Sequence, residues 1–233
     1  MNNSNQGYVT SQGGLNSFLT KMYGFMAGAV AFSAVIAYLC ATTFQMQVLS
    51  FFGQHRFAFF ALFAVQLAMV FGVSFKPGRS ATSSITLLFA FAGIEGLFLS
   101  TILMVYDISH VTMAFVAAAA DFVVLAIFGA TTKKDLSGIG SQALAALIAL
   151  LIVTFINIFL QSPMISYVFS FIGVIIFTIL TAWDSQNFKN MYLQFGGQVN
   201  STSLAVSGAL QLYLDFINIF IQLVTIFSGG NRD

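Results

Sequence analysis

Four carboxylic acids lie inside long apolar stretches of this sequence: Glu95, Asp121, Asp184 and Asp215. If those stretches are membrane-spanning helices, Glu95, Asp121 and Asp215 stand about ten to twelve residues from an end, or about 15–18 Å, close to the bilayer midplane. Asp184 stands at the cytoplasmic end of its stretch. A carboxylate at the bilayer centre costs at least about 2.5–3.5 kcal/mol. Acids placed inside apolar stretches at such a cost indicate a use for them.

The chemistry open to these acids follows from the lack of basic partners. No Lys, Arg or His lies inside any of the apolar stretches, so each carboxyl is either neutral and hydrogen-bonded or ionised around a cation or a file of water. Two carboxyls that share a site hold one proton between them, because like charges at close range disfavour double ionisation. Loss of that proton leaves a charge that attracts Ca²⁺, which prefers oxygen ligands. The acids therefore suggest a pH-gated cation pathway.

Each acid also has a structural alternative. Glu95 is typical of a protonated residue that packs between helices, and Asp121 of a carboxyl that bonds to a Ser or Thr of a neighbouring span. Asp184 fits the headgroup region near Lys189. Asp215 has the weakest structural alternative of the four, so it is the best candidate for a functional role.

Enzymatic chemistry is not expected of this chain. A serine-type intramembrane protease needs a His inside a span, and the two histidines, His55 and His110, fall near span ends. No H-E-x-x-H metalloprotease motif is present, and the Gly-x-Gly-Asp loop of intramembrane aspartyl proteases does not precede Asp215. The single Cys40 excludes a disulfide framework and a cysteine-based metal site. We expect no resident cofactor, with Ca²⁺ as a transported ion.

The composition fixes the class of protein that must position these acids. Of 233 residues, 58% are hydrophobic and only 6% are Asp, Glu, Lys or Arg, against about 25% charged residues in a soluble domain. So few charges cannot cover a water-facing surface, and a net charge of +1 gives no attraction to nucleic acid. The chain is therefore predicted to be a membrane protein and not a soluble enzyme, a disordered protein or a nucleic-acid binder.

Apolar runs of about 20 residues predict an all-α, polytopic fold with seven transmembrane helices. The seven predicted spans are 22–42, 57–75, 83–104, 111–130, 141–160, 165–184 and 205–227. Residues 1–20 are expected to form a polar disordered tail, residues 21–228 the transmembrane domain, and residues 229–233 a short C-terminal tail. The connections are short, so function must reside in the helices or at their ends.

The basic residues predict the orientation of the bundle, because basic loops stay on the cytoplasmic side. One predicted face carries Lys21, Lys76, Arg79, Lys133, Lys134 and Lys189, and the other carries Arg56 and Arg232. This asymmetry predicts a multi-pass protein of the cell membrane with a cytoplasmic N-terminus and an extracellular C-terminus.

Three segments give the sequence a resemblance to a known family. They are Thr132–Ser137 (TKKDLS), Ala182–Gln186 (AWDSQ) and Leu212–Asn218 (LYLDFIN), with a weaker fourth at Gly93–Ser100. On these segments the chain resembles bacterial members of the transmembrane Bax inhibitor motif, or Bax inhibitor-1, family over about residues 20–228.

The resemblance implies a seven-helix fold in which a central helix is surrounded by the others, and a pH-sensitive Ca²⁺ leak. The family aspartates that match Asp184 and Asp215 form a hydrogen-bonded pair that senses pH near the cytoplasmic mouth and would contact Ca²⁺. The pair requires similar heights for the two residues, so either the sixth helix continues beyond 184 or the seventh begins nearer Asp215. Glu95 and Asp121 are then expected along the ion pathway.

The chain departs from the family pattern in several places. Bacterial relatives carry an Arg at the end of the second span that latches onto the sixth-span aspartate, and here the candidates for that latch are Lys76 and Arg79. Arg can bind a carboxylate bidentately, whereas Lys cannot. Trp183 stands where the family commonly has Tyr, and Asp121 is not required by the family pattern.

Two hypotheses follow for function. The first is a pH-sensitive calcium leak channel whose pathway opens when the Asp184–Asp215 pair loses its proton. The second is a non-transporting regulator that binds another membrane protein, such as a membrane-bound protease, through its polar N-terminal segment. Removal of residues 2–15 would abolish partner binding under the second hypothesis and leave ion flux intact under the first.

Overall fold

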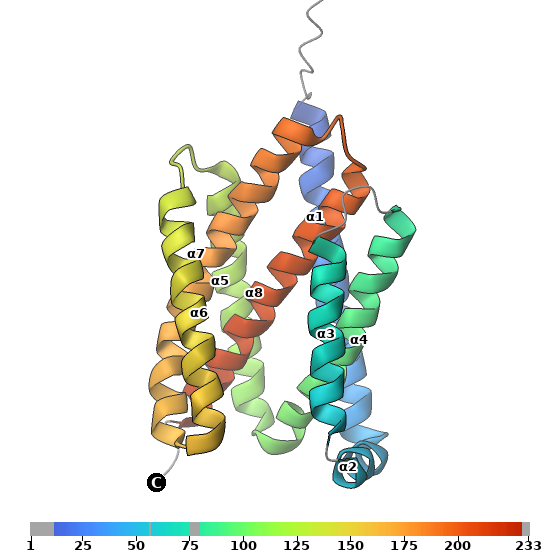
Figure 1. Ribbon diagram of the computed structural model, residues 1–233, viewed down its shortest axis with the longest axis vertical. Helices are drawn as coiled ribbons and strands as arrows, with labels where there is room; N and C mark the ends of the chain where they lie inside the picture. The colour runs from blue at the N-terminus through green and yellow to red at the C-terminus, as the bar shows by residue number, and fades with distance from the viewer. Residues whose placement is uncertain (1–11, 56, 75–79, 230–233) are drawn as a thin grey trace, which may run out of the picture.

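A computed structural model describes residues 12–55, 57–74 and 80–229, and all the regular structure in these ranges is α-helical. The helices in chain order are α1 (Gln12–Thr42), α2 (Gln45–Gln54), α3 (Ala58–Ser74), α4 (Ala81–Val105), α5 (Ile108–Thr131), α6 (Ser137–Leu160), α7 (Pro163–Phe195) and α8 (Ser201–Gly229). Figure 1 shows α1 and α3 to α8 running along the bundle, with the short α2 lying across its lower end.

Six of these helices, α1 and α4 to α8, are long and apolar enough to cross a membrane. The predicted span 57–75 coincides with α3, which has 17 residues and a shorter apolar core, Phe60–Val70. A helix of that length is about 25 Å long, at the lower limit for a spanning helix. The predicted all-helical membrane fold is therefore confirmed, and each predicted span falls on a helix.

The observed helix boundaries differ from the predicted ones in three places. Helix α1 begins at Gln12, so residues 12–20, expected in the tail, are helical. Helix α2 was not predicted, because it lies in a connection too short and polar to resemble a span. Helix α7 continues through residues 185–195, beyond the predicted end at 184. There hydropathy falls while the helix persists, because its polar side chains bond to neighbouring segments.

Short capping signals begin several helices. Ser80 accepts a hydrogen bond from the backbone of Ser83 at the start of α4, and Ser162 caps α7 just before Pro163. Asp107 accepts hydrogen bonds from the backbone N–H and hydroxyl of the serine two residues later, at 2.8 and 2.6 Å. These bonds hold the pKa of the exposed Asp107 carboxyl below its usual range.

Helix α8 occupies the centre of the bundle and crosses it obliquely (Figure 1). It packs against α7, α1, α5 and α4, and more lightly against α3. Half of its most apolar window is buried, against 11% for α6, which packs on α7 at the edge of the bundle. The expectation of one helix surrounded by others is thus met by α8, and the residues on it are the best placed to form an internal site.

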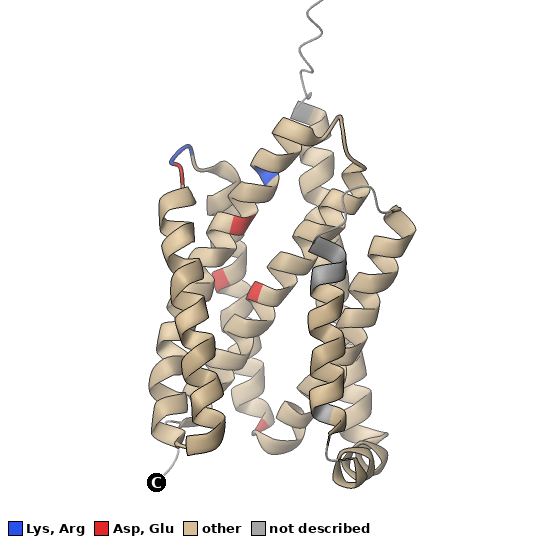
Figure 2. Ribbon diagram, in the orientation of Figure 1, with Lys and Arg blue, Asp and Glu red and all other residues tan. Residues whose placement is uncertain are grey.

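The outer surface suits contact with lipid. Helix α6 exposes a run of large apolar side chains, including Ile148, Leu151 and Phe155, and Figure 2 shows charged residues at only a few places on the ribbon. Blue positions gather at the upper end of the view, in the loop between α5 and α6 and along the last turns of α7. The start of α1 lies at that same end, and α8 ends at the opposite one (Figure 1).

Candidate functional site

Asp184 on α7 and Asp215 on α8 form a buried pair inside the bundle. Their side chains are 3% and 1% exposed and are in hydrogen-bonding contact with each other. Gln211, one turn before Asp215 on α8, also bonds to Asp184. The two helices share one of the most extensive packing seams of the bundle, so the pair is held by rigid elements and not by loops.

One oxygen of each carboxyl lacks a conventional hydrogen-bond donor. These atoms are Oδ2 of Asp184 and Oδ2 of Asp215, both buried, and neither finds an N–H or O–H donor in the described part of the chain. A buried acceptor left without a donor is costly. Because the two carboxyls are in contact, a single proton on one of them would make that carboxyl a hydrogen-bond donor to the other. The geometry therefore fits a pair that carries one proton.

The residues around Asp184 attach α7 to the elements around it. Ser185 donates to the carbonyl oxygen of Ala126 on α5 at 2.8 Å and bonds to the hydroxyl of Tyr23 on α1. The Gln186 amide donates to the carbonyl oxygen of Lys134 at 2.8 Å. Its oxygen accepts from the backbone N–H of Leu136 at 2.9 Å. These bonds fix the rotation and height of α7 and hence the place of the aspartate beside them.

Two glycines allow α7 to come close to its neighbours next to the pair. A Cβ at Gly129 on α5 would overlap the carbonyl group of Ala182, and a Cβ at Gly140 on α6 would overlap the ring of Trp183. No side chain larger than hydrogen fits either position without movement of a backbone or a packed ring. The resemblance segment Ala182–Gln186 is therefore packed against α5 and α6, tied to α1 and bonded to α8.

Lys189 lies one turn beyond this segment, and its ammonium does not neutralise the aspartates. Its Nζ donates to the carbonyl oxygen of Ala130 at 2.7 Å, in the last turn of α5. A cation at that position satisfies a free helix-terminal carbonyl and interacts well with the helix dipole. In the described ranges no basic side chain is paired with the aspartates, and the latch candidates Lys76 and Arg79 lie outside the described residues.

Glu95 and Asp121 are each bonded to a different neighbour and not to the pair. Glu95 on α4 accepts from the Gln66 amide on α3 at 2.8 Å. Asp121 on α5 accepts from the Thr178 hydroxyl on α7 at 2.9 Å. The bond between Asp121 and Thr178 agrees with the structural alternative for Asp121, in which its carboxyl bonds to a Ser or Thr of a neighbouring span. The place of these two acids on an ion pathway stays a prediction.

The donor set does not resemble a resident metal centre. Within residues 12–55, 57–74 and 80–229 there is no group of three or more His, Cys, Asp or Glu side chains that could hold an ion. Two carboxyls alone fall short of the six to eight oxygen ligands that Ca²⁺ takes. Contact between Ca²⁺ and the Asp184–Asp215 pair is thus a prediction about an ion in passage, with water completing its shell.

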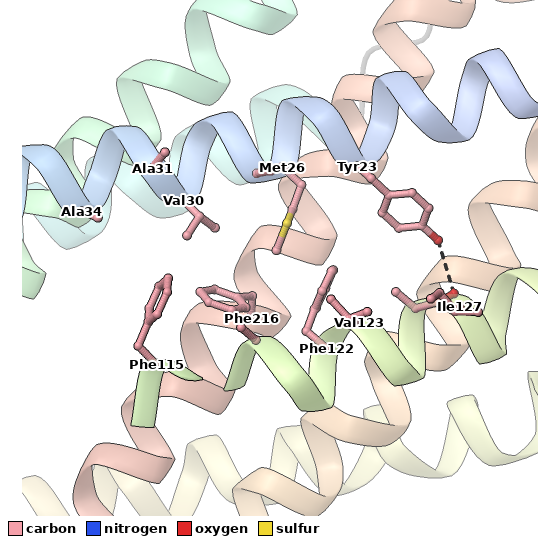
Figure 3. A pocket seen from close by; sticks show the side chains of 13 residues that line it. Tyr23, Met26, Val30, Ala31, Ala34, Phe115, Phe122, Val123, Ile127 and Phe216 are labelled. Atoms are coloured by element: carbon pink, nitrogen blue, oxygen red, sulfur yellow. Dashed lines mark hydrogen bonds between the residues drawn. The ribbon is translucent and has the colours of Figure 1, made fainter. Parts of the chain in front are cut away.

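Two cavities of the bundle differ in the polarity of their lining. One, of about 510 Å³, lies between α1, α5 and α8 and is lined by apolar side chains such as Met26, Phe122 and Phe216. In Figure 3 these side chains point into the space, and the Tyr23 hydroxyl turns away at one end toward the α5 backbone. The other, of about 640 Å³, lies at the far end of the bundle and is lined by polar groups including Asn157 and Ser166. Only the second suits a hydrated cation.

Sequence reasoning selected the two aspartates but not the residues that hold them. Gln211 lies four residues before Asp215, and that helical spacing is a usable signal for a shared face. Tyr23 and Gln186 carried no such signal, because their partners lie about 50 residues or more away in the chain.

Comparison with known proteins places the chain among bacterial membrane proteins. The sequence pattern of a family described as "Inhibitor of apoptosis-promoting Bax1" matches residues 15–233. The inner membrane protein YbhL of Escherichia coli K12 is 35% identical over 227 residues, which cover 96% of this chain and 95% of YbhL. The protein YrjE of Lactococcus lactis is 34% identical over 235 residues, 100% of both chains. A membrane protein of Streptococcus pyogenes serotype M3 is 36% identical over 226 residues, 97% of each chain.

Proposed function

The chain belongs to the Bax inhibitor-1 family of membrane proteins, and on that basis we propose that it is a pH-sensitive calcium leak channel gated by Asp184 and Asp215. The observation that carries the proposal is the buried contact between the two carboxyls, each with one oxygen that lacks a donor. The two carboxyls can form a hydrogen bond with each other when the pair holds one proton. They cannot do so when both are ionised.

The electrostatic cost of losing the proton is large enough to drive a conformational change. Two unit charges about 4 Å apart repel by about 4 kcal/mol at an effective dielectric constant of about 20. That energy corresponds to a factor of nearly 10³ against the closed, doubly ionised state. Separation of α7 from α8 relieves the repulsion and admits water and cations. Flux is therefore expected to rise from pH 5 to pH 8.

Other charged and titratable groups near the pair are few. They are Tyr213 on α8, Tyr23 on α1, Glu95 on α4, Asp121 on α5 and Lys189 on α7. The last four each have a hydrogen-bond partner elsewhere. None of them is bonded to either aspartate in the described ranges. The pair is consequently the group whose hydrogen bonding changes most when a proton is lost.

The proposed orientation places the pair toward the cytoplasmic half of the membrane. The loop between α5 and α6, which carries the exposed Lys133 and Lys134, lies at the end of the bundle where α1 begins (Figures 1 and 2), and the exposed Lys21 is the tenth residue of α1. Basic loops favour the cytoplasmic side, so the N-terminus would be cytoplasmic and the C-terminus external.

The test is Ca²⁺ entry into sealed liposomes that contain the purified protein, measured from pH 5 to pH 8. Wild-type flux is expected to rise at least tenfold across this range, whereas Asp184→Asn and Asp215→Asn should change less than twofold. Asp135→Asn, in the exposed loop after α5, is the matched control and should keep the wild-type pH response.

Two results would contradict the proposal. An unchanged pH response in Asp215→Asn would remove the sensor role from the pair. No flux above that of empty liposomes, from protein whose Trp183 fluorescence shows it to be folded, would remove the channel role and favour a non-transporting regulator.

A further inference from the structure

The central helix α8 carries a polar face along most of its length. Gln211, Asn218, Gln222 and Thr225 are spaced by seven, four and three residues, so they lie on one side of the helix. All four remain partly accessible, whereas the residues between them that point the other way, such as Leu212, are fully buried. A helix at the centre of a membrane bundle would be expected to place apolar residues on any surface open to lipid.

The polar groups of this face have little to bond to within the protein. The Asn218 amide donates to the carbonyl oxygen of Leu214 in its own helix at 2.7 Å. The Thr225 hydroxyl likewise donates within the helix, to Ile221 at 3.1 Å. In the described part of the chain the Gln222 amide has no hydrogen-bond partner. Amides are costly in hydrocarbon unless they face other polar groups or water, so this face is suited to contact with water.

The face extends from the carboxyl pair inside the bundle to the polar cavity at the end of the bundle where α8 finishes. At one end Gln211 bonds to Asp184 of the carboxyl pair. At the other end Thr225 and Ser228 line the polar cavity of about 640 Å³, and the buried Ser228 hydroxyl has no hydrogen-bond partner in the described part of the chain. From Gln211 to Ser228 is about 25 Å along the helix, most of the thickness of a hydrocarbon core of about 30 Å.

The seam between α7 and α8 accommodates the Gln222 side chain because position 173 on α7 is a glycine. A Cβ at Gly173 on α7 would lie 2.9 Å from Cδ of Gln222, so a larger residue at position 173 would displace the Gln222 side chain. By contrast, the cavity in Figure 3 lies between α1, α5 and α8 and offers a cation almost no oxygen ligands.

We propose that the polar face of α8, comprising Gln211, Asn218, Gln222 and Thr225, forms one wall of the cation pathway and leads from the aspartate pair to the polar cavity at the opposite end. The inference rests on the proposed leak function and adds the route that the cation takes through the protein. Amide and hydroxyl oxygens would replace part of the hydration shell of a passing Ca²⁺, which prefers oxygen ligands. Glu95 and Asp121, bonded to α3 and α7, would lie beside this route and not form its wall.

Cysteine accessibility tests the route without relying on transport. In a Cys40→Ala background, Asn218→Cys, Gln222→Cys and Thr225→Cys are reconstituted in liposomes and treated with a charged, membrane-impermeant methanethiosulfonate. The control is Leu151→Cys on α6, whose side chain is 59% exposed but faces lipid. Because thiols react as thiolates, which need water, the α8 cysteines should react at least tenfold faster at pH 8 than the control.

Ca²⁺ flux through two variants tests whether the polar side chains of α8 contribute to ion transport. Gln222→Leu and the isosteric Thr225→Val should each lower Ca²⁺ flux at pH 8 at least fivefold and keep the rise from pH 5 to pH 8, since the sensor is intact. Gln194→Leu, on the exposed end of α7, is the matched control and should leave flux unchanged. Trp183 fluorescence reports whether each variant is folded.

The two proposals fail in different ways. Unreactive α8 cysteines together with pH-dependent wild-type flux would overturn the route and leave the leak function standing. Reactive cysteines in a wild type that transports no Ca²⁺ would overturn the leak function, and with it any ion route along a water-filled seam. Reactive cysteines with undiminished flux in Gln222→Leu and Thr225→Val would refute the proposal that these side chains line the cation pathway.

Discussion

Replacement of Gln186 by Ala removes the link between α7 and the loop that follows α5. The side-chain amide donates to the carbonyl oxygen of Lys134 at 2.8 Å and accepts from the backbone N–H of Leu136 at 2.9 Å. Each hydrogen bond contributes about 0.5–1.5 kcal/mol, so the variant should lose about 1–3 kcal/mol. For a chain of this size a loss of 2 kcal/mol corresponds to a fall in Tm of about 4–8 °C.

Thermal unfolding in detergent, followed by the fluorescence of the single Trp183, measures this loss. Trp183 packs against Gly140 at the seam between α6 and α7, so it reports on the region that Gln186 holds. Gln194→Ala on the same helix is the matched control, because that side chain is exposed and makes no hydrogen bond with the described residues.

Hydrogen exchange at Leu136 provides a second readout that is specific to the lost bond. Its backbone N–H should exchange faster in Gln186→Ala and at the wild-type rate in Gln194→Ala. Equal Tm values for the two variants, with Leu136 equally protected in both, would refute the argument that Gln186 anchors the loop.

Three further outcomes are expected. Gly129→Ala should destabilise the protein by about 1–3 kcal/mol in thermal unfolding, because the new methyl group overlaps the carbonyl of Ala182 and a backbone must move. Asp107→Asn should reduce the loss of stability on acidification, seen in Tm across pH 2–5: the folded-state pKa of Asp107 is lowered, so its stabilisation is present above the unfolded-state value and is lost as pH falls through the folded-state value. Glu95→Leu should cost about 1 kcal/mol in the same assay, because it leaves the buried Gln66 amide without its acceptor; an unchanged Tm would show that the contact contributes nothing.

Much of the helical pattern could be predicted because a helix that crosses the bilayer needs an apolar run of a minimum length. Runs of about 20 apolar residues predicted seven segments, each of which falls on a helix, and six of these helices are long and apolar enough to cross a membrane. Hydropathy ended the predicted span at 184 because Gln186 and Lys189 lower it, although both bond to backbone carbonyls across a helix interface. The continuation of α7 beyond 184 was one of two alternatives that the family resemblance raised. Hydropathy reports how well a segment is accommodated in hydrocarbon. A helix can continue beyond the apolar run where its polar side chains form hydrogen bonds with neighbouring segments.

The candidate site was predictable only in part. Asp215 stood out because a carboxyl in mid-span is costly and has no basic partner nearby in the sequence. Its contact with Asp184 came from the family resemblance, and the helix extension to Phe195 explains how the two residues reach similar heights. Nothing in the sequence paired Glu95 with Gln66 or Asp121 with Thr178, because those contacts join helices whose relative rotation only the packed bundle sets.

The sequence alone determined that this protein is a helical membrane protein. It also showed that placing its few acids inside apolar spans costs free energy, which indicates a role for them. The tertiary structure decided how the two aspartates come into contact, since it places α8 at the centre and sets α7 against it through close contacts at glycine. It also decided that the polar residues of α8 form one partly accessible face. Hydrophobic length is a property of each segment by itself, whereas contact between Asp184 and Asp215 depends on the rotation and height of two packed helices.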